Sequence, residues 1–155
     1  MAILFATHEA YLDHLNGPHH QERPERLGAV IDGAHEAGLG EALVPLVPHA
    51  ATREQLLRVH TQEHVNRIEQ VVQQGGGRLD PDTRASSGSW TAATLAAGAG
   101  LTAIRALQSG QADSAFCAVR PPGHHATTDL YGGYCFFNNA AVAAHYVAST
   151  TGAKV

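Results

Sequence analysis

The sequence lacks the features that mark membrane, secreted and nucleic-acid-binding proteins. It contains no run of about 18 apolar residues, and its first residues have neither the basic segment nor the long apolar stretch of a secretion signal. Its 10 basic and 14 acidic residues give a formal net charge of -4, so no positive field would attract a polyanion. We therefore expect a cytoplasmic protein with neither a nucleic acid nor a membrane as partner.

Cysteine is also scarce. Cys117 and Cys135 are the two cysteines, and they show neither the pairing of a metal site nor the density of a disulfide scaffold. We expect both to be reduced, partly buried thiols that serve packing. With 155 residues, of which 44% are apolar, the chain is long enough for one domain with a hydrophobic core.

Short apolar runs predict three β-strands, over residues 3–7, 42–47 and 114–119. The third run has small and apolar residues on both faces, which is typical of a central parallel strand. Ala153–Val155 resembles the first residues of another strand.

Apolar residues at helical spacing separate these strands. They predict helices over 24–37, 90–107 and 139–149. Two further helices are expected after Thr52, which forms a capping box with Gln55, and after a second N-cap candidate, Thr61.

The remaining segments are expected to be loops on an open α/β sheet. Tyr11–Gln21, rich in His, Gly, Pro and Asn, is expected to be a surface loop, and Gly75–Ser89 the longest irregular stretch. Strands that alternate with helices predict a three-layer fold, in which a parallel sheet has helices on both faces. Ligands of such sheets bind beyond the carboxyl ends of the strands.

Arg120–Ala126 follows the third strand and combines two prolines, a glycine and two adjacent histidines. Two prolines fix φ, and Gly123 permits a sharp bend, so His124 and His125 can serve one site although they are adjacent. Neighbouring imidazoles disfavour each other's protonation, which suits general acid–base catalysis. The spacing alone leaves two interpretations open, catalysis or two loop histidines hydrogen-bonded to the backbone.

A metal-binding interpretation of these histidines has less support. Adjacent histidines seldom chelate one ion together, and a catalytic zinc needs three protein ligands with an open position. An unrelated metal hydrolase would use His19 and His20 together with His124 and His125, and tight zinc in the isolated chain would favour it. We expect no metal ligands within these residues.

Two motifs, taken together, closely resemble the histone deacetylase and acetylpolyamine amidohydrolase superfamily. They are Val119–Ala126, VRPPGHHA, and Gly133–Asn139, GYCFFNN. Glu22–Leu27 is similar to the family's early Pro-Glu-Arg segment, and residues 82–83 with 88–90 resemble the loop that opens its long helix. The resemblance covers essentially the whole chain and implies an arginase/deacetylase-like fold, of which the N-terminal part is present.

The resemblance implies roles for the paired histidines. His125 matches the general base and acid, and His124 its electrostatic partner. In the family, a zinc-bound water attacks the acetamide carbonyl and a histidine protonates the departing amine, which yields acetate and a free amine. The implied cofactor is therefore Zn²⁺, and the implied substrate is an acetylated lysine or an acetylated polyamine.

Further matches imply substrate contacts. Gly133 and Tyr134 match the wall of a narrow substrate tunnel, where the family usually has Phe. Arg26 matches an arginine that lines an internal channel behind the site, and a helix-surface salt bridge is an equally good interpretation. Asp82, or Asp80 in a shifted alignment, matches a rim aspartate that accepts substrate hydrogen bonds, whereas the simpler interpretation is a solvated turn carboxylate.

The family's metal ligands have no match in the sequence. In the family an Asp-x-His pair, a later Asp, a transition-state Tyr and the carboxylates that orient the histidines all follow the next strand. We therefore expect residues 1–155 to be the N-terminal part of one deacetylase domain, inactive alone. A downstream or complementing C-terminal part would bind the zinc, and a homo-oligomer is also possible. The alternative is a non-catalytic binding or assembly module that keeps half of the fold.

Overall fold

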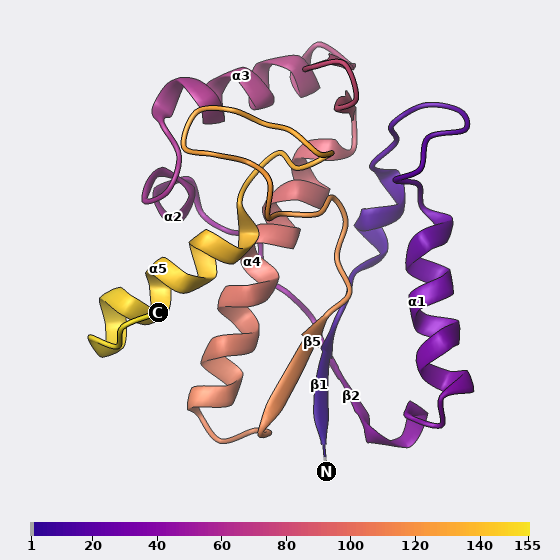
Figure 1. Ribbon diagram of the computed structural model, residues 1–155, viewed down its shortest axis with the longest axis vertical. Helices are drawn as coiled ribbons and strands as arrows, with labels where there is room; N and C mark the ends of the chain where they lie inside the picture. Colours follow the sequence, from indigo (N-terminus) through magenta and orange to yellow (C-terminus); the bar gives the residue numbers. More distant parts are fainter. Residues whose placement is uncertain (1) are drawn as a thin grey trace.

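A parallel sheet forms the centre of the computed structural model, which describes residues 2–155 (Figure 1). β1 (Ile3–Ala6) lies between β2 (Leu43–Leu46) and β5 (Ser114–Cys117), and both neighbours run parallel to it. The three strands predicted from apolar runs are confirmed. Because these strands are parallel, the chain must cross back between them, and helices provide the crossings.

Helices lie on both sides of the sheet. α1 (Glu25–Glu36) lies on one side, and α4 (Ser89–Gln108) and α5 (Asn139–Thr151) lie on the other (Figure 1). α4 packs along α5 and also contacts β5 and β1. The three-layer α/β arrangement is therefore confirmed. Within residues 2–155, no helix has both the length and the apolar character needed to cross a membrane.

Two shorter helices begin at the predicted caps. The Thr52 hydroxyl accepts a hydrogen bond from the Gln55 N–H, and the Gln55 side chain accepts one from the Thr52 N–H at 2.8 Å, which starts α2 (Arg53–Leu57). The Thr61 hydroxyl caps α3 (Gln62–Gln73). These side chains pair with amide groups that have no partner within the helix.

The hydrophobic core has two clusters, and α4 contributes to both from different faces. Ala93, Ala97 and Leu101 of α4 pack against α2, α3 and α5. The main partners there are Leu56, Val65, Ile68, Phe136, Phe137 and Val142. The second cluster joins α4 to the sheet and α1, and its members are Phe5, Tyr11, Leu27, Ala92, Leu95, Ala96 and Ala118.

The prediction of a long irregular loop over Gly75–Ser89 is wrong. β3 (Gly76–Arg78) and β4 (Arg84–Ser86) form an antiparallel pair there. Each strand has only 3 residues, so neither shows the alternation that identifies a strand in a sequence. Ala85 of β4 is buried in the core, which indicates that packing against α3 supports the pair.

The prediction of a surface loop over Tyr11–Gln21 is confirmed in part, because most of these residues are exposed. Its first residues belong to a 3₁₀ helix over Glu9–Asp13, and Tyr11, His14 and Asn16 are all buried. Polar composition suggested exposure, but polar side chains can be buried where hydrogen bonds satisfy them. These three side chains therefore form part of the interior, whereas the tip of the loop, over residues 17–19, is exposed.

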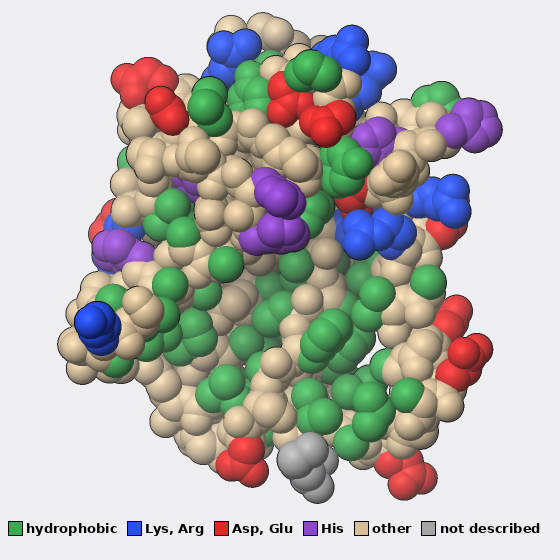
Figure 2. Space-filling model, viewed as in Figure 1, with side chains coloured by type: hydrophobic (Ala, Val, Ile, Leu, Met, Phe, Trp, Pro, Cys, Tyr) green, Lys and Arg blue, Asp and Glu red, His purple; other side chains and the backbone are tan. Residues whose placement is uncertain are grey.

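β5 differs from its predicted position at the centre of the sheet. Within residues 2–155 it is an edge strand, and the Phe116 side chain is 51% exposed while its ring stacks on Phe5 at 5.8 Å between centroids. Phe116, Phe5 and Val30 line an apolar hollow of about 340 Å³. Figure 2 shows hydrophobic side chains over the lower part of this face. Ala153–Val155 forms no strand.

Gly98 allows the backbone of α4 to lie directly against the chain after β2. A Cβ atom added at this position would overlap the His49 carbonyl oxygen and approach the Ala51 nitrogen to 2.6 Å. We expect Gly98→Ala to lower the free energy of unfolding by about 1–3 kcal/mol, because backbone atoms must shift to make room. Urea denaturation measures this change.

Gly28→Ala is the matched control for that substitution. Gly28 lies in α1, and no atom lies within 4 Å of an added Cβ atom. Alanine should raise the free energy of unfolding there by about 0.5–1 kcal/mol, because it has the higher helix propensity. Equal shifts in the two variants would contradict the close approach at Gly98.

Candidate functional site

The carboxyl ends of β1 and β5 lie side by side, because their parallel register aligns Ala6 with Cys117. The Ala118 N–H extends the pairing by donating to the Ala6 carbonyl at 2.9 Å. Two loops therefore leave the same edge of the sheet, one over residues 7–24 and the other over residues 118–138. This edge is where open α/β sheets bind ligands.

A cavity of about 340 Å³ lies between these two loops and the turn before β4. All six residues singled out by the family resemblance line it: Arg26, Asp82, His124, His125, Gly133 and Tyr134. Gln21, Glu22 and Pro122 complete the wall. The fold thus brings together residues from separate parts of the sequence, while their chemical roles remain predictions.

His124 and His125 are in contact at this cavity. Their ring centroids lie 4.3 Å apart with the planes inclined at 45°, and both side chains are exposed. Figure 2 shows histidine side chains gathered near the middle of this face. The His124 N–H donates to the Cys135 sulfur at 3.5 Å, which ties the pair to the following loop. Exposed imidazoles of this kind can exchange protons with a molecule in the cavity.

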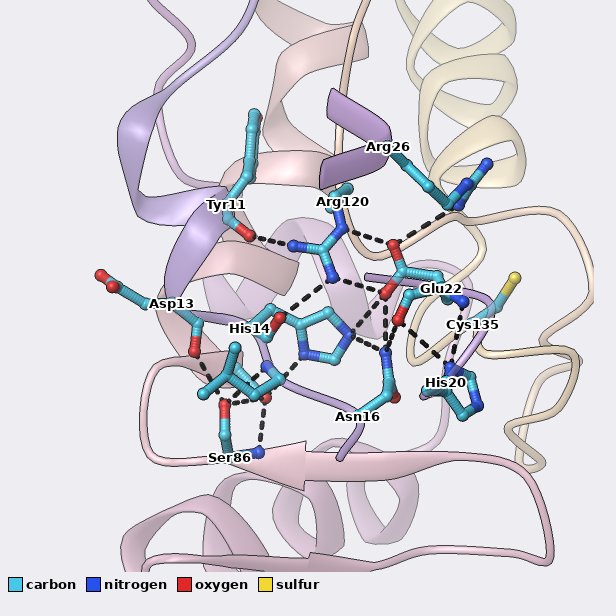
Figure 3. A network of polar contacts seen from close by, with 12 residues as sticks. Tyr11, Asp13, His14, Asn16, His20, Glu22, Arg26, Ser86, Arg120 and Cys135 are labelled. Carbon is cyan, nitrogen blue, oxygen red and sulfur yellow. Dashed lines mark hydrogen bonds and ion pairs between the residues drawn. The ribbon is translucent and has the colours of Figure 1, made fainter. Parts of the chain in front are cut away.

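A buried ion pair joins the two loops beside the cavity (Figure 3). The Glu22 and Arg120 side chains are 0% and 2% exposed. Arg120 donates from Nη2 to Oε2 of Glu22 at 2.8 Å and from Nε to Oε1, so the contact is bidentate. Arg120 also donates to the carbonyls of Tyr11 at 2.6 Å and His14 at 3.0 Å. The residue that starts the histidine loop is thereby fixed to the loop after β1.

Glu22 has further partners in the same buried network. Asn16 Nδ2 donates to Oε2 at 2.6 Å, and His14 Nε2 lies 3.3 Å from the same oxygen. Burial alone would raise the pKa of Glu22, but the hydrogen bonds from His14 and Arg120 and the charge on Arg120 lower it to about 2. Glu22 is therefore a fixed negative charge near neutral pH.

Sequence reasoning assigned no role to Glu22 or Arg120, although both stand in motifs of the resemblance. They are 98 residues apart, and no spacing rule connects them. The one available signal was a pair of opposite charges in two segments that follow strands of the same sheet.

Arg26 lies in the first turn of α1, four residues after Glu22, and its Nη1 atom is 3.5 Å from Oε1 of Glu22. Its side chain is 55% exposed and lines both the main cavity and a smaller one of about 120 Å³ beside Cys117. The geometry therefore accommodates both interpretations of Arg26, a channel residue and a salt bridge. Both cysteines are free thiols as expected, and burial raises the pKa of Cys117.

Gly133 and Tyr134 turn the loop over the histidines. Gly133 has φ of 54°, and an added Cβ atom would lie 2.6 Å from Cδ2 of His125, so a side chain does not fit. Tyr134 has φ of 68°, which is unusual for a bulky residue. Its ring meets the edge of the His20 ring with centroids 4.7 Å apart. The aromatic wall is thus built on two successive left-handed residues.

His20 contacts Glu22, Asp82 and Tyr134, which all line the cavity, and the sequence did not predict these contacts. Its Nδ1 atom accepts the Glu22 N–H at 3.0 Å, and its Nε2 atom lies 3.1 Å from the Asp82 carbonyl oxygen (Figure 3). The tautomer with the proton on Nε2 satisfies both contacts. The sequence suggested His20 only as part of a metal cluster, because nothing in its spacing relates it to Asp82 or Tyr134.

Of the two candidate rim aspartates, Asp82 lines the cavity. Asp80 instead accepts hydrogen bonds from the Asp82 N–H at 2.9 Å and the Thr83 N–H at 2.7 Å, which closes its own turn. These bonds lower the pKa of Asp80 even though burial opposes them. The turn-carboxylate interpretation therefore fits Asp80, and Asp82 is the candidate for substrate contact.

Within residues 2–155, no group of three or more His, Cys, Asp or Glu side chains is arranged to hold a metal ion. The alternative cluster of His19 and His20 with His124 and His125 does not form. The described residues therefore do not make a zinc site by themselves.

Comparisons with known proteins show which family the chain resembles. Residues 20–155 match the family model of the histone deacetylase domain. A probable deacetylase of Archaeoglobus fulgidus is 40% identical over 137 residues, which cover 87% of this chain and 38% of the relative. The histone deacetylase-like amidohydrolase of Pseudomonas aeruginosa is 39% identical over 127 residues, which cover 80% of this chain and 33% of the relative.

A solved structure extends the likeness to three dimensions. The HD domain of HDA15 superposes with a TM-score of 0.87 and 32% identity, over 97% of this chain and 45% of that chain. The present chain thus spans less than half the length of each of these three proteins.

Proposed function

The chain belongs to the histone deacetylase domain family, and we propose that it carries the acid–base half of a zinc-dependent hydrolase of acetyl-amide bonds. The observation that carries the proposal is the contact pair His124–His125 in one cavity with Gly133 and Tyr134. Acetyl-lysine or acetylated polyamines are the proposed substrates. The amidohydrolase name of the Pseudomonas aeruginosa relative supports this reaction class.

His125 is the proposed base and acid of this reaction. It takes a proton from the water that attacks the acetamide carbonyl, and it returns the proton to the nitrogen as the C–N bond breaks. The products are acetate and a free amine. His124 is the proposed electrostatic partner of His125, and the Tyr134 ring is the proposed apolar wall for the stem of the substrate.

Zinc belongs to the proposal, but the described residues do not fit it. We propose that its ligands come from the part of the domain that the relatives have and that this chain does not cover. A downstream segment or a complementing C-terminal chain would supply them. A homo-oligomer stays a prediction as well.

A chimaera tests the proposed function, in which the remainder of the Archaeoglobus fulgidus relative follows residue 155. We expect the chimaera to bind stoichiometric zinc and to release acetate from an acetyl-lysine peptide, an acetylated polyamine, or both. The 155-residue chain alone should do neither, because the metal-binding part is missing. The ratio of the two rates identifies the preferred substrate.

One outcome would contradict the catalytic proposal. A folded, zinc-loaded chimaera that binds the acetylated compounds without hydrolysing them would favour the alternative, a non-catalytic binding or assembly module. Stoichiometric zinc in the 155-residue chain would contradict the proposed origin of the metal ligands.

A further inference from the structure

A second pair of histidines lies outside the cavity and holds the loop that follows the first pair. His60 precedes α3 and His64 lies in its first turn, and their side chains are 2% and 3% exposed. Their rings stack with centroids 4.8 Å apart and the planes inclined at 22°. Neither residue lines the cavity. Two buried imidazoles with no contact to the site call for a physical explanation.

Each ring makes one hydrogen bond to the backbone at the end of the loop. The His60 Nε2 atom accepts the Asn138 N–H at 2.9 Å, so it must be unprotonated. The His64 Nε2 atom lies 2.8 Å from the Phe136 carbonyl oxygen, to which it donates. Both bonds are satisfied when both rings are neutral and carry their protons on different nitrogens.

Asn138 also binds Ala126, the residue that follows the proposed base. Its Nδ2 atom donates to the Ala126 carbonyl at 2.9 Å, and its Oδ1 atom accepts the Ala141 N–H at 2.9 Å to cap α5. Ala126 directly follows His125. One residue therefore links the buried His60 ring, the start of α5 and the histidine loop.

Packing adds to the hydrogen bonds. The ring of Phe137 lies 5.5 Å from His60, and the ring of Tyr131 stacks on His64 at 5.8 Å between centroids. The Thr61 N–H donates to the Thr128 carbonyl at 2.9 Å, so the beginning of the loop is attached to the same segment. The loop between Ala126 and Asn138 is thus fixed at both ends by residues 60–64.

We propose that His60 and His64 are positioning residues, which as neutral imidazoles hold the loop Ala126–Asn138 so that His125 and Tyr134 keep their places at the cavity. This inference rests on the proposed function for its catalytic consequence. The positioning itself is a property of the 155-residue chain and can be measured without any activity.

The charge state of the pair follows from its surroundings. Burial, followed by the effect of His64, lowers the pKa of His60 to about 4, and burial lowers the pKa of His64 as well. The other charged or titratable groups nearby are Asp129 and Tyr131 of the loop and Arg67 of α3, which lies over the Tyr131 ring at 5.9 Å. From α4, the uncharged Trp90 ring meets the Phe137 ring with centroids 6.0 Å apart.

The direction of the pH effect is determined by these shifts. When the loop opens, His60 regains an ordinary pKa near 6.5 and binds a proton more readily than in the closed state. The closed loop is therefore fully favoured above pH 6.5 and loses stability as the pH falls toward 4. Each pH unit in that window should favour opening by up to about tenfold.

Hydrogen exchange of the 155-residue chain tests the positioning. His60→Leu removes the acceptor, and we expect exchange of the Asn138 amide to rise by about tenfold relative to amides of α4. His60→Gln keeps an acceptor that does not titrate, so it should retain protection at pH 7 and show a smaller loss below pH 6.5, which His64 alone then causes. His49→Leu, at an exposed histidine, is the control and should change neither.

Activity in the chimaera provides the second measurement. We expect His60→Leu to lower kcat by about tenfold or more with a smaller change in KM, because misplacement of the base affects the reacting geometry. His60→Gln should recover most of kcat.

Three outcomes would overturn the proposal. They are unchanged Asn138 exchange in His60→Leu, a uniform rise in exchange across the whole chain, and the same loss below pH 6.5 in His60→Gln as in the wild type. If His60→Leu does not fold, the His60→Gln pH profile still decides. An inactive wild-type chimaera would sink only the proposed function, because the exchange results do not depend on it.

Discussion

Replacing His125 with alanine in the chimaera should lower kcat/KM for acetyl-amide hydrolysis by about 10²–10⁴-fold, the usual contribution of a general acid–base residue. The imidazole is exposed to the cavity, contacts His124 and is packed against Gly133. Its proposed proton transfer occurs in the transition state, so kcat should carry the loss and KM should change little. His124→Ala should have a smaller effect, because its proposed role is electrostatic. Steady-state acetate release measures both.

Two controls make this result specific. His49→Ala removes an exposed imidazole on another part of the surface and should leave the rate unchanged. Zinc content and thermal unfolding should match the wild type in the His125→Ala chimaera, because the side chain lies on the surface. Full activity in that variant would show that His125 is not the base.

Glu22→Gln should destabilise the 155-residue chain by about 3–5 kcal/mol, the typical effect of removing one partner of a buried ion pair. The substitution keeps the shape but leaves the Arg120 guanidinium, which is 2% exposed, without a counter-charge. His14 and Asn16 would lose their charged partner at the same time. Urea denaturation at pH 7 gives the free energy of unfolding for wild type and variant.

An exposed carboxylate provides the comparison. Glu25 pairs with Arg23 at 4.0 Å, and their side chains are 75% and 60% exposed, so Glu25→Gln should change stability by no more than about 0.5 kcal/mol. Comparable losses of unfolding free energy in Glu22→Gln and Glu25→Gln would contradict a larger contribution from the buried pair.

Acid titration tests the same pair in a second way. The pKa of Glu22 is about 2 in the folded chain and near 4.5 in a free side chain. Its contribution is fully present above pH 4.5 and is lost as the pH falls toward 2, because the unfolded chain binds the proton first. The slope of stability against pH in this window should be shallower in Glu22→Gln than in the wild type.

Most of the secondary structure could be predicted from local pattern. The capping box at Thr52 and the helical spacing of α4 are properties of neighbouring residues, and both are confirmed. The hairpin over Gly76–Ser86 could not be predicted, because strands of 3 residues show no period and form through packing on α3. β5 has the composition of a central strand, yet among residues 2–155 it has one neighbour.

The residues that line the candidate site could be predicted from the sequence, but the buried residues that hold them in place could not. Arg26, Asp82, Tyr134 and the paired histidines were singled out from motifs, and all of them line one cavity. The buried supports were not recognised, because Glu22 with Arg120 or His60 with Asn138 are contacts between distant segments. The type of a polar residue does not show whether the fold buries it or exposes it.

The sequence by itself determined the family, the order of strands and helices, and which loop carries the paired histidines, because motifs and periodicity are written in neighbouring residues. Only the tertiary structure decided what holds that loop in place. Parallel pairing of β1 with β5 brings the loop of Glu22 against Arg120, and the segment of His60 packs under Asn138. Burial and hydrogen-bond partners arise only when distant segments meet, so the supports of the site could be read from the folded chain alone.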